Sequence, residues 1–278
     1  MTSFTCMTYN IHHGAGNDDC LTPSSPAGVV PHADCSLDLE RIAQVILFES
    51  PDIVAVQELD RFWARSGGVD QPIELARLLD MSVVFGPNLQ QGPNQDAEEP
   101  HEYGIAILCR HDILRSHHHM LHTEEGWEQR GFLDVRIAVP SVGEIAIINT
   151  HLQSGSRGKP NRGAILQRQR QAAEIAAYIK SIGVPVILMG DFNANLVDGE
   201  IEALAGKDSP VSDIWSELGE SSPHTYPANP AKDAEIHIDH IFISREVGVS
   251  SAKVVTTELA ALASDHFPVV AEIQMQTP

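Results

Sequence analysis

A carboxylate and a carboxamide stand two positions apart where an apolar segment ends. Residues 184–189 are largely apolar, and Gly190, Asp191, Phe192 and Asn193 follow them. An aspartate can hold a cation or take a proton from water, and an asparagine can donate to a phosphate oxygen. The pair therefore predicts chemical work at the end of a buried strand.

The same arrangement recurs, because polar residues flank most of the apolar segments of the chain. These residues are Asn10, Gln57, Glu58, Tyr103, Asn149, His151, Asp239, His240, Asp265 and His266. A single residue of this kind is most often a solvated loop residue. In a sandwich of mixed sheets, however, the ends of neighbouring strands meet at one rim, so we expect these side chains to converge on one cleft.

Oxygen donors dominate this set of side chains. They are Asn10, Glu58, Asp191, Asn193, Asp239 and Asp265. Such donors suit a hard cation such as Mg²⁺, whereas the HExxH and CxxC spacings typical of zinc sites do not occur in the sequence. His151 and His266 add hydrogen-bond donors. The combination predicts metal-assisted hydrolysis of a phosphoester; the missing GxSxG and GxxxxGK[ST] motifs disfavour a serine hydrolase and a P-loop protein.

Short segments rich in Val and Ile predict the strands that position these residues. We expect strands at Phe4–Ile11, Ile53–Leu59, Ser82–Phe85, Ile105–Cys109, Leu133–Val139, Glu144–Leu152, Val186–Met189, Ile238–Ile243, Lys253–Thr257 and Val269–Met275. A tight turn at Pro140–Gly143 joins two of them, whereas helical patterns separate others. This mixture predicts an α/β sandwich of mixed sheets rather than a doubly wound parallel sheet.

Three segments show helical spacing. They lie around Leu39–Leu47, after Pro72, and from about Gly163 to Ile182 before Gly183. No linker or internal repeat divides the sequence, so we expect one domain over residues 1–278, with a loop insertion at 14–35.

Charge and composition limit the classes of partner. The chain has 278 residues and 42% hydrophobic residues, and 18 Lys and Arg against 38 Asp and Glu give a net charge of −20. This balance disfavours nucleic acid, whose binding relies on neutralised phosphates, without excluding it. No segment approaches the roughly 20 apolar residues of a membrane helix, and the N-terminus does not resemble a signal peptide, which favours the cytoplasm. Cys6 and Cys109 fit a core; a bridge between Cys20 and Cys35 would instead fit secretion.

Seven motifs together resemble the endonuclease/exonuclease/phosphatase superfamily, which has the DNase I-like fold. The motifs are TYNIHHG, VQELD, YGIAIL, NTHLQ, GDFNAN, IDHIF and SDHFPV, and they follow the family's order from Tyr9 to Val270. The resemblance implies a four-layered α/β sandwich that hydrolyses phosphoester bonds with a divalent metal, Mg²⁺ or also Mn²⁺.

The resemblance also implies a role for each matching residue. The metal ligands are Glu58, Asn10 and Asp265. The catalytic group contains His151 at the scissile phosphate, Asp191 at the attacking water, Asn193 at a phosphate oxygen, Asp239 paired with His266, and Tyr103 near the phosphate. Whether His266 or Asp191 acts as the acid or base stays open.

Several further residues have two interpretations. His12 either lines the cleft or does not, and Arg130 either contacts a phosphate or is a solvated surface residue. The histidines at 117–119 and 122 are expected in a solvated loop. The segment Gln153–Gln171 contains five basic and no acidic residues, and it either steers phosphates or covers a helix face.

These observations predict the class of substrate but not the substrate itself. We expect a phosphodiesterase or phosphatase acting on small or lipid-headgroup phosphoesters. The alternatives are a Mg²⁺-dependent nuclease and a non-catalytic phosphate-binding module; the presence of Glu58, Asp191 and His266 argues against the latter.

Overall fold

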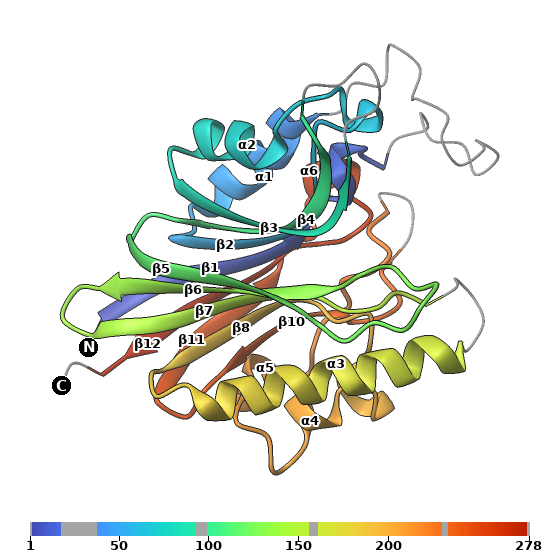
Figure 1. The fold of residues 1–278 in the computed structure, drawn as a ribbon. Coiled ribbons are helices and arrows are strands. Elements are labelled where there is room, and N and C mark those ends of the chain that lie inside the picture. Colours follow the sequence, from blue (N-terminus) through green and yellow to red (C-terminus); the bar gives the residue numbers. More distant parts are fainter. Residues whose placement is uncertain (1, 18–37, 93–98, 156–160, 230–232, 277–278) are drawn as a thin grey trace.

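The computed structural model describes residues 2–17, 38–92, 99–155, 161–229 and 233–276. Two six-stranded sheets pack face to face, and helices cover the outer face of each sheet (Figure 1). The result is a four-layered arrangement of helices, sheet, sheet and helices. The expected α/β sandwich of two mixed sheets is confirmed.

The first sheet has the strand order β11-β12-β1-β2-β4-β3. Its strands are β1 (Thr2–Asn10), β2 (Ile53–Arg61), β3 (Ser82–Gln91), β4 (His101–Cys109), β11 (Val247–Val254) and β12 (Val269–Met275). β1 and β2 are parallel, and the other neighbours are antiparallel. The sheet is therefore mixed.

The second sheet has the order β5-β6-β7-β8-β10-β9. Its strands are β5 (Asp112–Met120), β6 (Gly131–Val139), β7 (Gly143–His151), β8 (Val186–Asp191), β9 (Ser212–Asp213) and β10 (Asp239–Ile243). Here β7 and β8 are the parallel pair. In each sheet, two parallel strands thus end at the same edge.

The helices lie on the two outer faces, as Figure 1 shows. They are α1 (Leu39–Glu49), α2 (Gln71–Leu79), α3 (Arg162–Ser181), α4 (Glu202–Ala205), α5 (Ile214–Leu218) and α6 (Glu258–Ala263). The three longest helices begin at side chains that accept a hydrogen bond from the first turn, Asp38, Asp70 and Asn161. None of the helices in the described ranges is long and apolar enough to cross a lipid bilayer.

Burial on both faces explains why the central strands appear in the sequence as continuous apolar segments. One apolar cluster fills the space between the sheets, and two others lie between a sheet and its helices. Within β4, for example, Ile105 and Ile107 belong to the cluster between the sheets, whereas Ala106 and Leu108 pack against the helices. The sandwich therefore holds the strand ends rigidly.

Two sequence-based assignments are wrong. The strand expected at Lys253–Thr257 is β11, which begins at Val247 and ends at Val254. The histidines at 117–119 belong to β5 rather than to a solvated loop, and the side chains of His118 and His119 are partly buried.

Other expectations fall on residues that the structure does not describe. The proposed insertion at 14–35 is described only as far as Asn17, and Cys20, Cys35, Arg157 and Lys159 lie outside the described ranges. Cys6 and Cys109 are buried free thiols, as expected of core residues.

Candidate active site

Each sheet contains one pair of parallel strands. The ends of these two pairs meet at the end of the sandwich remote from both chain termini (Figure 1). In the first sheet, Asn10 of β1 lies beside Gln57 of β2. In the second, His151 of β7 lies beside Asp191 of β8, and β10 begins opposite Asp191 with Asp239. Both sheets therefore deliver polar side chains to one rim.

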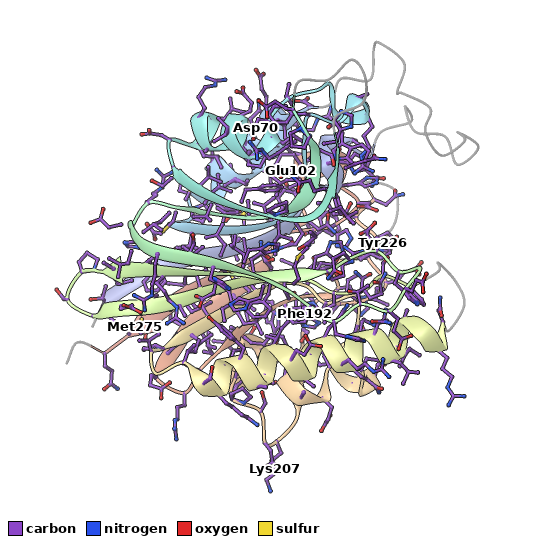
Figure 2. The ribbon with its side chains drawn as sticks, in the orientation of Figure 1. Asp70, Glu102, Phe192, Lys207, Tyr226 and Met275 are labelled. Atoms are coloured by element: carbon purple, nitrogen blue, oxygen red, sulfur yellow. The ribbon has the colours of Figure 1, made fainter. Side chains whose placement is uncertain are left out.

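Seven of the residues singled out in the sequence form one connected cluster at this rim. They are Asn10, Glu58, His151, Asp191, Asn193, Asp239 and His266, joined by contacts of 2.9 to 3.8 Å. Tyr226 packs its ring against His266, and Figure 2 shows it at the end of the molecule opposite Met275. The expected convergence is confirmed for these seven residues. It is wrong for His240, which faces the other side of β10, and Gln57 and Asn149 bond to each other at 2.7 Å in the interior.

Asn10 links the two sheets at the centre of the cluster. Its Nδ2 donates to Oε1 of Glu58 at 3.1 Å and to Oδ2 of Asp191 at 3.0 Å, and its Oδ1 accepts from the backbone N–H of His12 at 3.1 Å. Every hydrogen-bonding group of this buried amide except one lone pair is used. The amide therefore fixes both carboxylates relative to each other.

Unusual backbone geometry aims two of these side chains. Glu58 lies at a β-bulge between β2 and β4 and has a φ of 61°, and Asn193 has a φ of 51°. Such conformations are strained for residues other than glycine, and they cluster at functional sites. The bulge turns Glu58 out of the regular alternation of β2.

Gly190 allows β8 to approach β7 closely beneath Asp191. Its φ is 153°, and a Cβ atom at this position would lie 2.1 Å from the carbonyl oxygen of Thr150. No side chain fits there without moving the backbone. Steric exclusion of any side chain therefore explains the glycine in the GDFNAN motif.

Arg130 determines which nitrogen of His151 carries the proton. Nη1 of Arg130 lies 2.9 Å from Nδ1 of His151, and a guanidinium can only donate, so Nδ1 accepts and the proton is on Nε2. Nε2 lies 3.4 Å from Oδ2 of Asp191 and 3.1 Å from Nδ2 of Asn193. The N–H groups of His151 and Asn193 therefore lie side by side.

The environment keeps His151 neutral. Burial lowers the pKa of the imidazole well below its usual value, and the positive charge of Arg130 lowers it further. Arg130 itself is buried, with 3% of its surface exposed, and its Nη2 lies 2.9 Å from Oε1 of Glu128. The interpretation of Arg130 as a solvated surface residue is therefore wrong; its guanidinium acts on His151.

His266, by contrast, is held in its charged form. Burial opposes the charge, but Asp239 and Asp191 outweigh burial and raise the pKa of His266 well above its usual value. Nδ1 of His266 lies 2.9 Å from Oδ2 of Asp239, and its Nε2 lies 3.8 Å from Oδ2 of Asp191. The side chains expected to pair are thus in hydrogen-bond contact.

Asp191 is a buried carboxylate with a raised pKa. Burial raises its pKa to about 7; the charge of Asp239 acts in the same direction, whereas His266 opposes it. A carboxylate with a pKa near neutrality is a suitable general base, because it is partly ionised and still basic enough to take a proton. Asp191 can therefore act as a general base.

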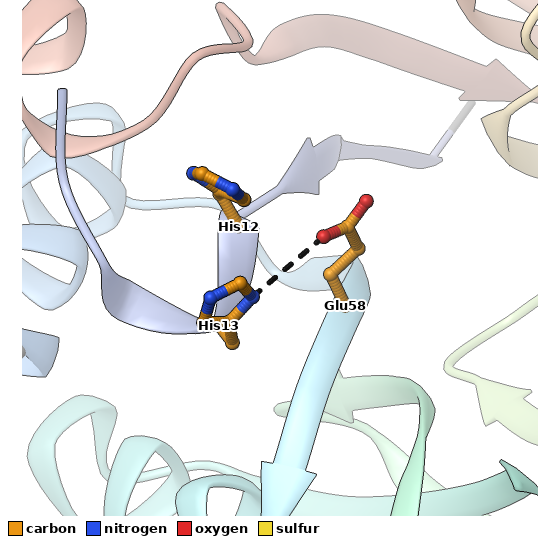
Figure 3. A group of neighbouring side chains, drawn as sticks. All are labelled: His12, His13 and Glu58. Atoms are coloured by element: carbon orange, nitrogen blue, oxygen red, sulfur yellow. Dashed lines mark ion pairs between the residues drawn. The ribbon is translucent and has the colours of Figure 1, made fainter. Parts of the chain in front are cut away.

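A second group, formed by His12, His13 and Glu58, lies at the mouth of the site (Figure 3). Nδ1 of His13 lies 3.9 Å from Oε2 of Glu58, and Nδ1 of His12 lies 3.8 Å from Oδ1 of Asp265. Neither nitrogen has a hydrogen-bond partner among the described residues, although both are buried. Both imidazoles belong to a 3-10 turn that follows β1, and His12 lines the cleft.

The donor set at this mouth fits a divalent cation. Burial tends to raise the pKa of Glu58, but His13 and Asn10 hold it well below its usual value, so the carboxylate is ionised. An ionised carboxylate beside imidazole nitrogens that lack partners suits Mn²⁺ as well as Mg²⁺. His13 was not among the residues proposed from sequence; its position next to His12 was the available signal.

A cleft of about 300 Å³ opens beside these residues. It is lined by His12, His13, Glu58, Trp63, Arg65, Leu89, Tyr103, Glu128, Arg130 and Ser154. Tyr103 thus lies where the sequence placed it, while Trp63 and Arg65 are additional. A larger hollow of about 630 Å³ near Lys180 and Glu246 contains none of the cluster residues and lies elsewhere.

The basic segment Gln153–Gln171 contributes less to the site than its charge suggests. Arg168 is buried, pairs with Glu200 and donates to the carbonyl oxygen of Gln153 at 2.7 Å. Arg170 pairs with Glu124 on the surface. These two side chains of α3 are therefore occupied by structural contacts.

Comparison with known proteins agrees with this geometry. The model of the Endonuclease/Exonuclease/phosphatase family matches residues 7–266. No curated protein matches the chain. The structure is similar to an endonuclease/exonuclease/phosphatase from Beutenbergia cavernae, with 24% identity, a TM-score of 0.73, and coverage of 98% of this chain and 72% of that one.

Two further solved structures are similar at full length. A mannosyl-6-phosphatase from Bacteroides thetaiotaomicron has 21% identity and a TM-score of 0.68, over 98% of this chain and 100% of that one. TDP2 from D. rerio, complexed with a single-strand DNA product, has 19% identity and a TM-score of 0.68, over 99% and 100%. Identities this low show a common fold, and the match of the family model to nearly the whole chain shows that it belongs to the endonuclease/exonuclease/phosphatase family.

Proposed function

We propose that the chain is a divalent-metal-dependent hydrolase of phosphoester bonds. The observation that carries this proposal is the position of Asp191, in contact with Asn10, His151 and His266. A base, neutral N–H donors and a cationic imidazole thereby surround one point. Hydrolysis of a phosphoester by water requires these groups.

The protonation state of each residue then determines its role. Asp191 takes the proton of the attacking water. The Nε2–H of His151 and the Nδ2–H of Asn193 donate to phosphate oxygens, where negative charge increases during the reaction. His266, kept protonated beside Asp239, adds a positive charge on the other side of Asp191.

A cation belongs at the mouth of the site. Glu58, Asn10 and Asp265 are its proposed oxygen ligands, and His12 and His13 lie close enough to join them. When bound, a Mg²⁺ or Mn²⁺ ion supplies a Lewis acid for the phosphate oxygens. The side chains of this chain hold it and orient the phosphate.

The preferred substrate is a small or lipid-headgroup phosphoester. A net charge of −20 repels a long polyanion over most of the surface, whereas a single phosphate responds mainly to charges within about 10 Å. The cleft of about 300 Å³, with Trp63 and Tyr103 in its wall, has the size for a small organic group next to the phosphate. Similarity to the mannosyl-6-phosphatase supports this class.

A nuclease is the second candidate. It is favoured by similarity to TDP2, whose structure contains a single-strand DNA product. A nuclease needs a basic surface along which several phosphates are neutralised together, so its affinity falls steeply with salt. Salt dependence therefore separates the two candidates.

The decisive measurement is kcat/KM for a panel of phosphomonoesters, phosphodiesters, phospholipids, plasmid DNA and single-stranded RNA. Each is assayed with Mg²⁺ and with Mn²⁺ at two salt concentrations. We expect the best small substrate to exceed duplex DNA at least ~10-fold per scissile bond, a margin of about 1.4 kcal/mol. Efficient cleavage of DNA or RNA with a steep salt slope would instead identify the nuclease.

Glu58→Gln is the matched control for this panel, because it removes the charge that faces the cation and keeps the shape of the side chain. We expect kcat/KM to fall about 100-fold, or ~2.7 kcal/mol, and the affinity for Mn²⁺ measured by calorimetry to fall with it. Unchanged turnover in this variant, or full activity of the wild type in excess EDTA, contradicts the metal-dependent mechanism.

A further inference from the structure

Asp213, His237 and His240 bring three buried ligand atoms together outside the active-site cluster. One ligand atom from each lies within 4.8 Å of the others. The side chains are nearly inaccessible, with exposed fractions of 4%, 4% and 0%. On β10, His240 directly follows Asp239, and successive side chains of a strand point to opposite faces, so the group lies behind the active site.

Each of the three side chains leaves one polar atom without a partner. These atoms are Oδ2 of Asp213, Nε2 of His237 and Nδ1 of His240, none of which has a hydrogen-bond partner among the described residues. Buried polar atoms are nearly always satisfied, so three orphan atoms in one place require an explanation.

In each imidazole, the nitrogen that is bonded to a carbonyl oxygen carries the proton, so the nitrogen without a partner does not. Nδ1 of His237 donates to the carbonyl oxygen of Pro223, and Nε2 of His240 donates to the carbonyl oxygen of Ala194 at 2.9 Å. Neutral rings thus present bare lone pairs on Nε2 of His237 and Nδ1 of His240. Histidines that bind metals are typically oriented in this way, with the other ring N–H donated to a carbonyl.

Asp213 is oriented in a similar manner. Its Oδ1 accepts from the backbone N–H groups of Trp215 and Ser216 at 3.0 and 3.3 Å, which caps α5 and fixes the carboxylate. Oδ2 then faces Nδ1 of His240 at 3.8 Å, too far for a hydrogen bond. Three acceptors consequently face one another with no donor between them, which is unfavourable in a buried site.

A cation at the centre removes this conflict. Two bonds of about 2.1 Å from a zinc ion to nitrogen or oxygen place their ligand atoms about 3.4 Å apart at the tetrahedral angle and at most about 4.2 Å apart. The separation of 3.8 Å therefore needs little adjustment, and a side-chain rotation brings in the third ligand. Two imidazoles with one carboxylate suit Zn²⁺ or a similar transition-metal ion better than Mg²⁺. We propose that Asp213, His237 and His240 bind a Zn²⁺ ion that is separate from the cation of the active site.

Such an ion would stabilise the edge of the second sheet. Asp213 belongs to β9 and His240 to β10, which pair through only two residue pairs. His237 precedes β10, and Asp239 lies between the two histidines. The ion would connect these segments and fix the start of the strand that carries Asp239.

The test uses the full-length chain with the active-site group disabled by Glu58→Gln and His13→Gln. Zinc chloride alone is the probe, and calorimetry together with elemental analysis gives the stoichiometry. We expect one Zn²⁺ per chain, and Co²⁺ in its place should give the intense visible absorption of a tetrahedral site. X-ray absorption should show two imidazole ligands.

Single substitutions in the same background locate the ion. His237→Gln and Asp213→Asn should each weaken zinc binding at least ~100-fold, since loss of a ligand costs no less than the 10- to 100-fold typical of an orienting partner. Asp213→Asn retains Oδ1 as the cap of α5, which keeps the fold comparable by circular dichroism. His118→Gln, which replaces a partly buried histidine elsewhere, should leave zinc binding unchanged.

Failure of the disabled chain to bind one Zn²⁺ overturns the proposal. Unchanged zinc affinity in a folded Asp213→Asn variant overturns it as well. Asp191, Asp239 and His266 offer only one imidazole to a metal ion, so two imidazole ligands in the X-ray absorption spectrum identify the proposed site even if a ligand variant does not fold. Neither outcome affects the proposed hydrolase activity, which depends on Glu58.

Discussion

The proton on His151 depends on one neighbour, the buried guanidinium of Arg130. Arg130→Met removes the donor and the positive charge while filling a similar volume. We expect the pKa of His151 to rise, because part of the repulsion that lowers it disappears, and the proton to populate Nδ1 as well as Nε2. Turnover should fall about 10- to 100-fold, as for other partners that orient a histidine.

Nitrogen-15 NMR of the imidazole reads this effect directly, because the two tautomers and the imidazolium differ in chemical shift. Glu128→Gln is the control, since it removes the other partner of Arg130 and retains the contact with His151. An unchanged tautomer in Arg130→Met would assign Arg130 to structure alone.

Asp239 and His266 should act as one unit. Their contact of 2.9 Å keeps His266 protonated, so Asp239→Asn and His266→Ala each remove the same positive charge from the site. We expect each single variant to lose about 100-fold in kcat, and the double variant to lose little more than either alone. Additive losses in the double-mutant cycle would separate the two roles.

The sequence indicated most of the rim residues, but it indicated neither their protonation states nor the residues that orient them. Asp191, His151 and His266 stood out because polar residues at the ends of apolar segments are visible in a sequence. The contact between Arg130 and His151 was not visible, because it joins two residues 21 positions apart through a buried side chain. The HxxH spacing of His237 and His240 likewise gained meaning only once Asp213 lay beside it.

At the scale of elements, prediction succeeded for strands buried on both faces and failed at two edge strands, β5 and β11. The central strands are continuous apolar segments, whereas β5 and β11 are edge strands rich in polar residues. An edge strand has one solvated face and often carries charge or histidine, so the apolar signal is weak. Helix α3 was located within one residue because Gly183 follows it.

The close approach of β7 and β8 allows a sharp test of this architecture. Gly190→Ala places a Cβ atom 2.1 Å from the carbonyl oxygen of Thr150. We expect the free energy of unfolding to fall by about 3 kcal/mol, because the parallel strands must separate, and activity to fall as Asp191 shifts. Urea unfolding measures the first effect and kcat the second.

Gly183→Ala is the matched control, because a Cβ atom there meets nothing within 4 Å and the backbone is not left-handed. Its free energy of unfolding should change by less than about 0.5 kcal/mol. Equal stabilities of the two variants would mean that β7 and β8 do not require their close spacing.

At the scale of the whole molecule, composition does not predict how individual charges are paired. The net charge of −20 applies to the surface as a whole. Arg168 and Arg170, for which the sequence left open phosphate steering or coverage of a helix face, are paired with Glu200 and Glu124. Pairing of this kind depends on which helices and loops become neighbours, and a sequence alone does not supply that.

His118 makes the stability of the chain depend on pH. Its ring packs over Gly86 and Gly131, and its Nε2 lies 3.0 Å from Oδ1 of Asn88. Burial, followed by the nearby His119 and His117, lowers its pKa to about 4. The folded protein therefore resists protonation of His118 that the unfolded chain accepts near pH 6.5.

The sign of the effect follows from this difference. Above about pH 6.5 both states of the chain leave His118 neutral, so it does not make stability depend on pH. As the pH falls from about 6.5 to about 4, the unfolded state binds a proton first, and the free energy of unfolding decreases. After allowance for the partial exposure of the ring, we expect a loss of about 1 to 2 kcal/mol from this residue.

His118→Gln tests this contribution, because glutamine can still reach Asn88 and does not titrate. Urea unfolding between pH 7 and pH 4.5, in EDTA so that release of metal does not contribute, should show a shallower decline for the variant than for the wild type. The two curves converge at low pH if His118 carries the effect. Parallel curves would assign the acid sensitivity to other buried histidines, such as His237, whose pKa burial lowers to about 2.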